Sequence, residues 1–365
     1  MQACHLTSVH NRFDTRIFVN EIPSLASEGF EVCAIVADGK GDEERKNFNI
    51  YDVGKPKTRF HRILFTTKRV YKKALEVDAK AYHLHDPELL LIAKKLKKRG
   101  KKVIYDAHED VPRQIVNKHW INKGLRKVIS NPIEFYENRI SKKLDYIITA
   151  TSFIRDRFLL INKNVTDINN FPIIASTGKT IDEAKRKKEI CYIGSISKVR
   201  GLNELVEALS LLPGVSLNLA GTYSPENYKN DLKKIPGWEK VIEYGFANRE
   251  MAKEIMNRSI AGMVTLHPII NYIDALPVKM FEYMAAGIPV IASDFPLWKN
   301  IVEGCKCGIC VDPLNPEVIA KAVQYIFQHK KEASQMGLNG RKAVLEKYNW
   351  EIEKQKLIGV YKKLI

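Results

Sequence analysis

The segment DALPVKMFEYMAAGIPVIASD, residues 274–294, places two acids, a proline and a lysine ahead of a run of small residues. Pro277 suits the first position of a helix, where a missing N–H leaves no hydrogen bond unmade, and Gly287 favours the left-handed end of that helix. Residues 290–292 form the short apolar run of a buried parallel strand. The segment predicts a loop, a helix over residues 278–286, a tight turn and a strand.

The start of this predicted helix is a candidate anion site. The first N–H groups of a helix are unpaired and carry roughly half a positive charge. Lys279 adds a full charge in the first turn, so the local field favours a phosphate. Glu282 lies about one turn further along, and Asp274 precedes the helix. The alternative is that Asp274 is a solvated loop acid and Lys279 an ordinary surface lysine.

The composition is that of a globular protein. The chain has 365 residues, of which 45% are hydrophobic and 28% charged, and this length suffices for two domains with separate cores. The formal net charge of +17 indicates an anionic partner: nucleic acid, an anionic membrane surface or phosphorylated small molecules. No apolar run approaches the roughly 18–20 residues of a membrane span, and MQACHLTSVHNRFDTR does not resemble a signal peptide, so we expect a cytoplasmic protein.

Cys305, Cys307 and Cys310 form a cluster among the six cysteines. Three thiols could contribute to a zinc site, but a structural zinc site usually has four ligands. The segment GICVDP is typical of a strand that points Cys310 away from the other two. We therefore expect reduced, packed thiols instead of a metal site or a disulfide.

Strands and helices alternate along the chain. AYHLH is followed by Asp86-Pro87-Glu88, which is typical of a helix start with Asp86 as the N-cap. A helix that ends before Gly100 and the strand KKVIYD complete a βαβ unit. The pattern recurs near the start, where Pro23 should kink or shorten a helix over residues 17–28. It recurs again in the second half, with EICYIGS, VSLNLAG and IAGMVTL as strands.

This alternation predicts two Rossmann-like, doubly wound α/β domains with a ligand cleft between the carboxyl edges of their sheets. The linker FPIIASTGKTIDEAKRKKE contains turn formers and a charge run. We expect a first domain over residues 1–171, a second over residues 172–347, and a helix over residues 348–365 that packs back toward the first domain.

Residues 57–76 predict a basic amphipathic helix. Such helices often lie on anionic membrane surfaces, although an ordinary surface helix with its apolar stripe on the core explains the pattern equally well. The apolar positions are Phe60, Ile63, Leu64, Tyr71, Ala74 and Leu75, and the basic positions are Arg59, Arg62, Lys68, Arg69, Lys72 and Lys73.

Several motifs together resemble the family 4 glycosyltransferases of the GT-B fold, especially bacterial enzymes that build surface polysaccharides such as O-antigen. The resemblance covers nearly the whole chain. It rests on SVHNRFDTRIF, HLHDPELL, IYDAHED, YIGSISKVRGL, DALPVKMFEYMAAGIPVIASD and CGICVDPLNPEVIAKAV.

The resemblance implies that the helix at residue 278 faces the diphosphate of a nucleotide-sugar. Its motif has two acids separated by seven residues: Glu282 is then expected on the ribose, and Asp274 on the transferred sugar. Asp274 is one methylene shorter than the usual glutamate. In YIGSISKVRGL the usual arginine position is Ser195 and the usual lysine position is Arg200. The other donor residues implied are Lys198, Lys279, Leu276, Pro277 and Val278, with Tyr244 and Phe246 near the base.

The resemblance also implies a site in the first domain. His108 matches a histidine beside the reacting sugar; alternatively it only caps the next helix. A glycine-rich loop of the family is replaced by His10-Asn11-Arg12-Phe13-Asp14. From this loop and the residues after it, His10, Arg12, Asp14 and Arg16 are expected on the acceptor side. Tyr244-Gly245-Phe246 could equally be a simple turn.

For the reaction, the resemblance implies a hexosyltransferase that retains the anomeric configuration and uses a UDP-sugar in preference to a GDP-sugar. The acceptor is expected to be a lipid-linked saccharide at the inner face of the membrane. No cofactor is expected, and because no Asp-x-Asp motif occurs, no metal is expected; oriented cations then stabilise the departing diphosphate. Alternatives are a nucleotide-sugar epimerase of the same fold and a basic nucleic-acid-binding protein, although no nucleic-acid motif is present.

Overall fold

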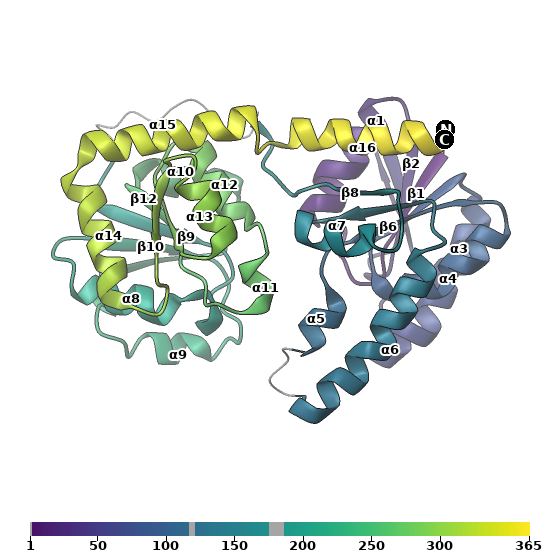
Figure 1. Ribbon diagram of the computed structural model, residues 1–365, viewed down its shortest axis with the longest axis horizontal. Coiled ribbons are helices and arrows are strands. Elements are labelled where there is room, and N and C mark those ends of the chain that lie inside the picture. Colours follow the sequence, from purple (N-terminus) through teal and green to yellow (C-terminus); the bar gives the residue numbers. More distant parts are fainter. Residues whose placement is uncertain (1, 117–120, 175–185) are drawn as a thin grey trace. The chain divides into compact units, whose positions relative to one another are not determined.

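The computed structural model describes residues 2–116, 121–174 and 186–365, so linker residues 175–185 lie outside the described residues. The chain divides into two compact units (Figure 1): Met1–Asn170 with Glu351–Ile365 form the first, and Phe171–Trp350 form the second. Each unit contains a mostly or wholly parallel sheet with helices packed against it. The prediction of two doubly wound α/β domains is confirmed.

The sheet of the first unit has the order β3-β4-β2-β1-β5-β6-β7-β8, and among the described pairings only β3 with β4 is antiparallel. Its central strands are buried along most of their length, as parallel strands covered by helices must be. The strands are β1 (Gln2–Leu6), β2 (Glu31–Val36), β3 (Glu43–Arg45), β4 (Phe48–Asp52), β5 (Ala81–Leu84), β6 (Lys102–Ala107), β7 (Tyr146–Thr149) and β8 (Val165–Asp167).

The helix predicted over residues 17–28 is divided near Pro23 into a π-helical segment, η1, and a short α-helix, α1. A proline near a helix start has no N–H to leave unpaired there, which explains why α1 begins at this point. The helical segments of the first unit are η1 (Thr15–Glu21), α1 (Ile22–Ser27), α2 (Arg59–His61), η2 (Arg62–Thr66), α3 (Thr67–Val77), η3 (Pro87–Leu89), α4 (Leu90–Lys98), α5 (Val111–Val116), α6 (Lys123–Ser141), α7 (Ser152–Leu159) and α16 (Trp350–Leu364).

The sheet of the second unit has the order β11-β10-β9-β12-β13-β14, and all its described pairings are parallel. Its strands are β9 (Glu189–Ile193), β10 (Ser216–Ala220), β11 (Val241–Gly245), β12 (Ala261–Val264), β13 (Val290–Ser293) and β14 (Gly308–Val311). Its helical segments are η6 (Lys198–Arg200), α8 (Leu202–Ser210), α9 (Tyr228–Leu232), η7 (Trp238–Lys240), α10 (Arg249–Arg258), α11 (Ile270–Ile273), α12 (Val278–Ala285), α13 (Pro296–Val302), α14 (Pro316–Gln328) and α15 (Lys330–Glu346).

Each sheet has a point at which the strand order reverses. In the second unit β9 lies between β10 and β12, and in the first unit β1 lies between β2 and β5. Ligands of doubly wound sheets bind outside the carboxyl ends of the strands at such points. The loops after β9, β12, β1 and β5 are therefore the places where this fold positions a site.

The last helix of the chain belongs to the first unit. After the second unit ends at Trp350, α16 packs against the first unit, where the Glu353 carboxylate accepts a hydrogen bond from the Asn169 amide at 2.9 Å. The Tyr361 side chain is fully buried there. The first unit is thus built from both ends of the chain.

Candidate active site

In the second unit, the loop after β9 packs closely against the segment after β12. Gly201 has a φ of 73°, and a Cβ at this position would lie 1.7 Å from the carbonyl oxygen of Thr265. Only glycine permits this approach. The His267 amide donates to the Val199 carbonyl at 3.0 Å. The two loops therefore form one edge at the point where the strand order reverses.

The predicted donor residues Ser195, Lys198 and Arg200 lie in the loop after β9. The Arg200 guanidinium is 5.6 Å from the centre of the Tyr272 ring in α11, a cation–π contact. The Ser195 carbonyl accepts a hydrogen bond from the Tyr192 hydroxyl at 2.7 Å. Burial raises the pKa of Tyr192 to about 12, although the nearby Arg200 charge opposes the shift. The loop therefore places Arg200 beside the helix that leads to Asp274.

The helix predicted after Pro277 is present as α12. Pro277 occupies the N-cap with an extended backbone, one position earlier than predicted, and makes no side-chain capping bond. Its ring offers no acceptor, so the first N–H groups of α12 receive no cap from it. Lys279 and Glu282 form an ion pair across one turn, and both side chains are about one third exposed. A ligand at this helix start would therefore meet both charges.

Buried contacts fix the start of α12 against the sheet. The Tyr283 hydroxyl accepts a hydrogen bond from the Ile193 amide at 2.9 Å, and a Cβ at Gly262 would lie 2.2 Å from the Tyr283 ring. The Trp298 indole donates to the Ala275 carbonyl at 2.7 Å. Because these anchors lie on the buried face, the opposite face with Lys279 and Glu282 is held in a fixed direction.

Asp274 and the residues that follow it lead into α12. Asp274 is half-buried at the end of α11, and within the described part of the chain its carboxylate has no hydrogen bond or ion pair. Leu276 and Val278 are half-buried beside Pro277. The structure thus brings Asp274, the start of α12 and Glu282 into one continuous segment of the second unit.

Tyr244 and Phe246 flank the end of β11, an edge strand. The Tyr244 hydroxyl donates to Asn218 Oδ1 at 3.1 Å, whereas the Phe246 side chain is 78% exposed. An exposed aromatic ring after a strand offers a face on which a nucleobase could stack. The Tyr244 ring, in contrast, has a structural partner.

In the first unit, Asp86 closes the loop after β1. Its Oδ2 accepts hydrogen bonds from the Thr7 hydroxyl at 2.9 Å and from the Ser8 amide at 2.5 Å. Asp86 stands at the N-cap position of η3 but makes no capping bond. The prediction of Asp86 as the N-cap residue is confirmed, but its carboxylate turns to the neighbouring loop instead of the helix start.

His10, Asp14 and His108 come together at this edge. His10 Nδ1 lies 3.1 Å from Asp14 Oδ2, and the ring centres of His10 and His108 are 4.7 Å apart. Burial lowers the pKa of His10, but the Asp14 hydrogen bond and the charges of nearby acids outweigh it, so the pKa is raised. Burial raises the pKa of Asp14, but the His10 hydrogen bond and the Ile17 amide together lower it to about 2. The predicted first-domain residues therefore include a charged pair beside His108.

Arg12 and Arg16 do not reach this edge as free cations. Arg12 is buried and donates to Asp38 at 2.7 and 2.8 Å and to Glu43 at 2.8 Å. Arg16 is buried and donates to both Asp106 oxygens at 2.8 Å. The expectation that these arginines approach the acceptor or the phosphates is not supported, because both guanidinium groups are held by acids distant in sequence.

A buried histidine layer was missed in the sequence. His5 of β1 lies opposite His83 of β5, and His85 stacks on His83 with ring centres 4.5 Å apart. His85 Nδ1 is 3.2 Å from His108 Nε2, and His108 Nε2 is 3.1 Å from Asp106 Oδ2. Burial lowers the pKa of His5, His83 and His85, the last to about 4. The alternation in HLH was the available signal, because residues two apart in a strand share a face.

The predicted basic helix is present as three segments, α2, η2 and α3. Ala74 is buried as an ordinary surface helix requires, but Phe60, Leu64 and Phe65 are exposed, Phe60 by 79%. Arg69 donates to the Gly54 carbonyl and the Thr66 hydroxyl. The exposed apolar residues therefore lie in α2 and η2, ahead of α3. Among the described helices, none has the length and apolar character needed to cross a membrane.

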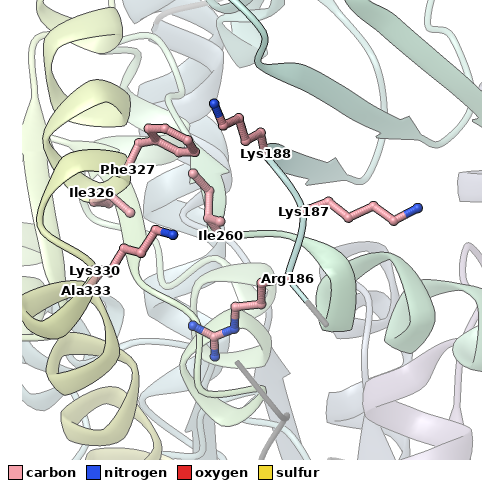
Figure 2. A pocket seen from close by; sticks show the side chains of 8 residues that line it. All are labelled: Arg186, Lys187, Lys188, Ile260, Ile326, Phe327, Lys330 and Ala333. Carbon is pink, nitrogen blue, oxygen red and sulfur yellow. The ribbon is translucent and has the colours of Figure 1, made fainter. Parts of the chain in front are cut away.

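The six cysteines are free thiols, and in the part of the chain that the structure describes Cys305, Cys307 and Cys310 do not form a metal-ligand cluster. A basic pocket in the second unit (Figure 2) is separate from the predicted donor residues. Lys188, whose ammonium lies 4.6 Å from the Phe327 ring centre, and Ile260 directly precede β9 and β12. The pocket therefore lies at the amino edge of the sheet, opposite the carboxyl edge described above.

Two family models match the chain in succession. A model of family 4 glycosyltransferases matches residues 15–170, and a model of group 1 glycosyl transferases matches residues 177–343. The first match ends where the first compact unit gives way to the second. Each unit therefore corresponds to one of the two matched domains.

Relatives and solved structures agree with these matches. An uncharacterized glycosyltransferase of Methanocaldococcus jannaschii is 27% identical over 180 residues, covering 48% of this chain and 45% of that protein; the chain spans about half the length of the curated relatives it matches. Sucrose-phosphate synthase of Thermosynechococcus elongatus has a TM-score of 0.80 at 16% identity, covering 100% of this chain and 98% of that one. HepE of Anabaena in complex with UDP has a TM-score of 0.76 at 12% identity, with 100% of both chains covered.

Proposed function

This chain belongs to the glycosyltransferases of GT-B architecture, and from that premise we propose that it transfers a hexose from a nucleoside diphosphate sugar to a saccharide acceptor. We favour a UDP-sugar as donor, retention of the anomeric configuration and no metal in the transfer step. The acceptor we propose is a lipid-linked saccharide at the inner face of a membrane, in the synthesis of a surface polysaccharide such as O-antigen.

The observation that carries the proposal is the start of α12. An uncapped helix start with Lys279 in its first turn suits a diphosphate, and Glu282 offers a carboxylate to a hydroxyl group one turn further on. Asp274, which has no partner in the described residues, precedes the same helix. These groups lie where a doubly wound sheet binds ligands.

We assign the remaining donor contacts on the same basis. Glu282 accepts from the ribose hydroxyls, Asp274 contacts the transferred sugar, and Phe246 stacks on the base. Arg200 and Lys279 stabilise the departing diphosphate, together with the α12 N–H groups, because charge develops there in the transition state. Ser195, Lys198, Leu276 and Tyr244 complete the surroundings of the donor, and His108 with His10 and Asp14 forms the acceptor side.

The alternatives are less well supported. Neither an epimerase reaction nor nucleic-acid binding is suggested by the two matched glycosyltransferase domains. A UDP-bound structural neighbour is consistent with a UDP donor, although at 12% identity that likeness concerns the fold. The preference for UDP therefore rests on the direct test below.

The test combines donor binding with one variant and one control. Purified protein is screened for thermal stabilisation by UDP, GDP and their sugars in the presence of EDTA, because a ligand of the folded state raises its stability. We expect one nucleoside diphosphate to stabilise the protein selectively. Glu282→Ala should lower the affinity for that nucleoside diphosphate by roughly 10- to 100-fold, because one or two hydrogen bonds to a charged group are lost. Glu303→Ala is the control, because it removes the acid of the ion pair between Lys299 and Glu303. It should leave the affinity for the nucleoside diphosphate unchanged.

Two outcomes would contradict the proposal. Equal affinity of the two variants, Glu282→Ala and Glu303→Ala, for the nucleoside diphosphate would show that Glu282 does not bind the donor. Absence of stabilisation by any nucleoside diphosphate, with DNA binding that weakens steeply with salt, would favour the nucleic-acid alternative.

A further inference from the structure

The buried histidine layer of the first unit contains a cluster of metal-ligand type. Its members are His5, Glu21, His83 and His85, all buried, and one potential ligand atom from each lies within 4.8 Å of the others. His5 Nδ1 and His85 Nε2 are 2.8 Å apart, and they lie 3.8 and 3.9 Å from Glu21 Oε2. β1 supplies His5, β5 supplies His83, the residue that follows β5 is His85, and η1 ends with Glu21.

Two of the ligands present atoms that form no hydrogen bond. Both carboxylate oxygens of Glu21 and Nε2 of His83 are buried and form none within the described structure. The nearest cation to Glu21 is Arg16, 3.0 Å from Oε1, but the Arg16 Nε–H already donates to Asp106. The Glu21 carboxylate has 0% exposure and shares the Arg16 charge with Asp106, so its buried environment favours a further cation.

The other ring nitrogen of each histidine is already occupied. The Tyr361 hydroxyl lies 2.9 Å from His83 Nδ1 and 3.2 Å from His5 Nε2. His85 Nδ1 lies 3.3 Å from Asp106 Oδ2. Histidines that bind a metal commonly direct their second nitrogen at such a hydroxyl or carboxylate, which fixes the tautomer and the ring orientation. The nitrogens that remain are His83 Nε2, which has no hydrogen bond in the described residues, and His5 Nδ1 and His85 Nε2, which share one hydrogen bond. An ion would replace that shared hydrogen bond.

We propose that His5, His83, His85 and Glu21 bind one divalent transition-metal ion of the zinc class as a structural site in the core of the first unit. Three imidazoles and a carboxylate suit Zn²⁺, and four protein ligands leave no position for a reacting molecule. Metal–ligand distances of about 2.0–2.1 Å in a tetrahedron place ligand atoms about 3.3 Å apart. The observed separations begin at 2.8 Å and do not exceed 4.8 Å, so binding an ion requires side-chain movements of about 1 Å.

The ion would join β1, η1, β5 and the residue after β5, His85, which itself contacts His108. Through Tyr361 it would also fix the docking position of α16. The site is separate from the donor residues of the second unit, so it leaves the expectation of metal-free sugar transfer unchanged. A neighbouring set, His85, Asp106 and His108, also has ligand atoms close together and is the competing location for an ion.

The experiment measures metal content in the intact chain. The purified protein is stripped with chelator, loaded with Zn²⁺ or Co²⁺, desalted and analysed by mass spectrometry for metal. We expect about one ion per chain, with absorption bands of tetrahedral Co²⁺ and X-ray absorption of the zinc protein showing imidazole and carboxylate ligands. Tyr361→Phe should weaken the affinity about 10- to 100-fold, the usual effect of losing an orienting partner.

Two variants, Glu21→Gln and His108→Ala, distinguish the proposed cluster from the competing set of His85, Asp106 and His108. The proposal requires that Glu21→Gln lose the ion and that His108→Ala retain it. It is overturned if the wild-type protein takes up no Zn²⁺ or Co²⁺ above background, if the Co²⁺ spectrum is not tetrahedral, or if only His108→Ala loses the ion. The spectra of the wild-type protein decide the question even if Glu21→Gln does not fold.

Discussion

The pair of His10 and Asp14 shows how individual residues set the charge of the first-unit site. The pKa of His10 is raised and the pKa of Asp14 is lowered. Both groups are therefore charged at every pH between these two pKa values. A positive imidazole ring beside His108 would favour an acceptor or leaving group that carries negative charge. The pair is therefore a titratable element of the acceptor side that we propose.

The sign of the pH effect follows from the direction of each shift. The His10 pKa is higher in the folded than in the unfolded state, so its contribution to stability is complete below about pH 6.5 and is lost as pH rises through the folded-state value. The Asp14 pKa is lower in the folded state, so its contribution is complete above about pH 4 and is lost as pH falls toward 2. Between these limits the ion pair stabilises the first unit.

We predict that Asp14→Asn lowers the His10 pKa, because the substitution removes the hydrogen-bonded charge that raises it. NMR titration of the histidine ring protons measures this directly. The signal of His329, an exposed residue of the second unit, should be unchanged by the substitution. A His10 midpoint that does not move would show that the neighbouring Asp86 maintains the shift.

For individual residues of the candidate site, some features could be predicted from the sequence and others could not. The helix that carries Lys279 and Glu282 was predicted correctly because Pro277 and Gly287 mark its two ends. Arg12 was misassigned because its partners are 26 and 31 residues away along the chain. A pairing of that kind depends on the packing of the folded unit and leaves no local pattern.

Among the elements, the segment α2–η2–α3 has the clearest surface character. The prediction of an amphipathic helix holds for α3, whose apolar residues Val70 and Ala74 are buried. The first two turns differ, since Phe60, Leu64 and Phe65 are exposed beside Arg59 and Lys68. Exposed apolar side chains next to basic ones are typical of segments that lie in an anionic membrane interface.

We predict that replacing Phe60, Leu64 and Phe65 with serine weakens binding to vesicles containing phosphatidylglycerol. Each large apolar side chain buried in the interface contributes about 1.5–3 kcal/mol, so the triple variant should bind at least 100-fold more weakly. Vesicle sedimentation measures the effect, and donor binding should be unchanged.

The exposed residue Leu338 of α15 offers a control, because its replacement with serine should leave sedimentation unaltered. Val128 and Ile129 are exposed on α6. If only their substitution weakened vesicle binding, α6 would be the helix that contacts the membrane.

Element by element, local signals predicted most of the fold. Strands such as β5, β6 and β9 lie where the apolar runs indicated, because buried parallel strands require such runs. α6 was not predicted, and Pro132 lies inside it, whereas proline normally indicates a helix boundary. The π-helical turns of η1 and η2 were also not predicted, because their hydrogen bonds depend on tertiary packing.

At the scale of the whole molecule, α16 is the element on which the two-unit organisation depends. It follows the second unit in sequence but belongs to the first unit, and its Leu357, Ile358, Val360 and Tyr361 are buried. Burial of these side chains contributes about 1.5–3 kcal/mol each, which together is comparable with the roughly 5–15 kcal/mol stability of a typical domain.

We therefore predict that deletion of residues 351–365 destabilises the first unit and spares the second. Hydrogen exchange should become rapid in β1, β5 and β6 and remain slow in β9, β10 and β12. Stabilisation by the donor nucleotide, which we assign to the second unit, should persist. Deletion of residues 364–365 alone is the matched control. Unchanged protection in β1 and β5 after the longer deletion would show that α16 is not needed for the first unit.

The placement of α16 also has a consequence for synthesis on the ribosome. Domains generally fold as they emerge, from the amino terminus onward, but the first unit here includes residues 351–365, which follow the second unit in sequence. At about 5–20 residues per second, the 180 residues of Phe171–Trp350 take about 10 to 40 s to translate. During that interval His5 of β1 and His83 of β5 lack the Tyr361 side chain that contacts them in the folded unit, while the second unit completes its own core. The part of the protein that is made first is thus the part that finishes folding last.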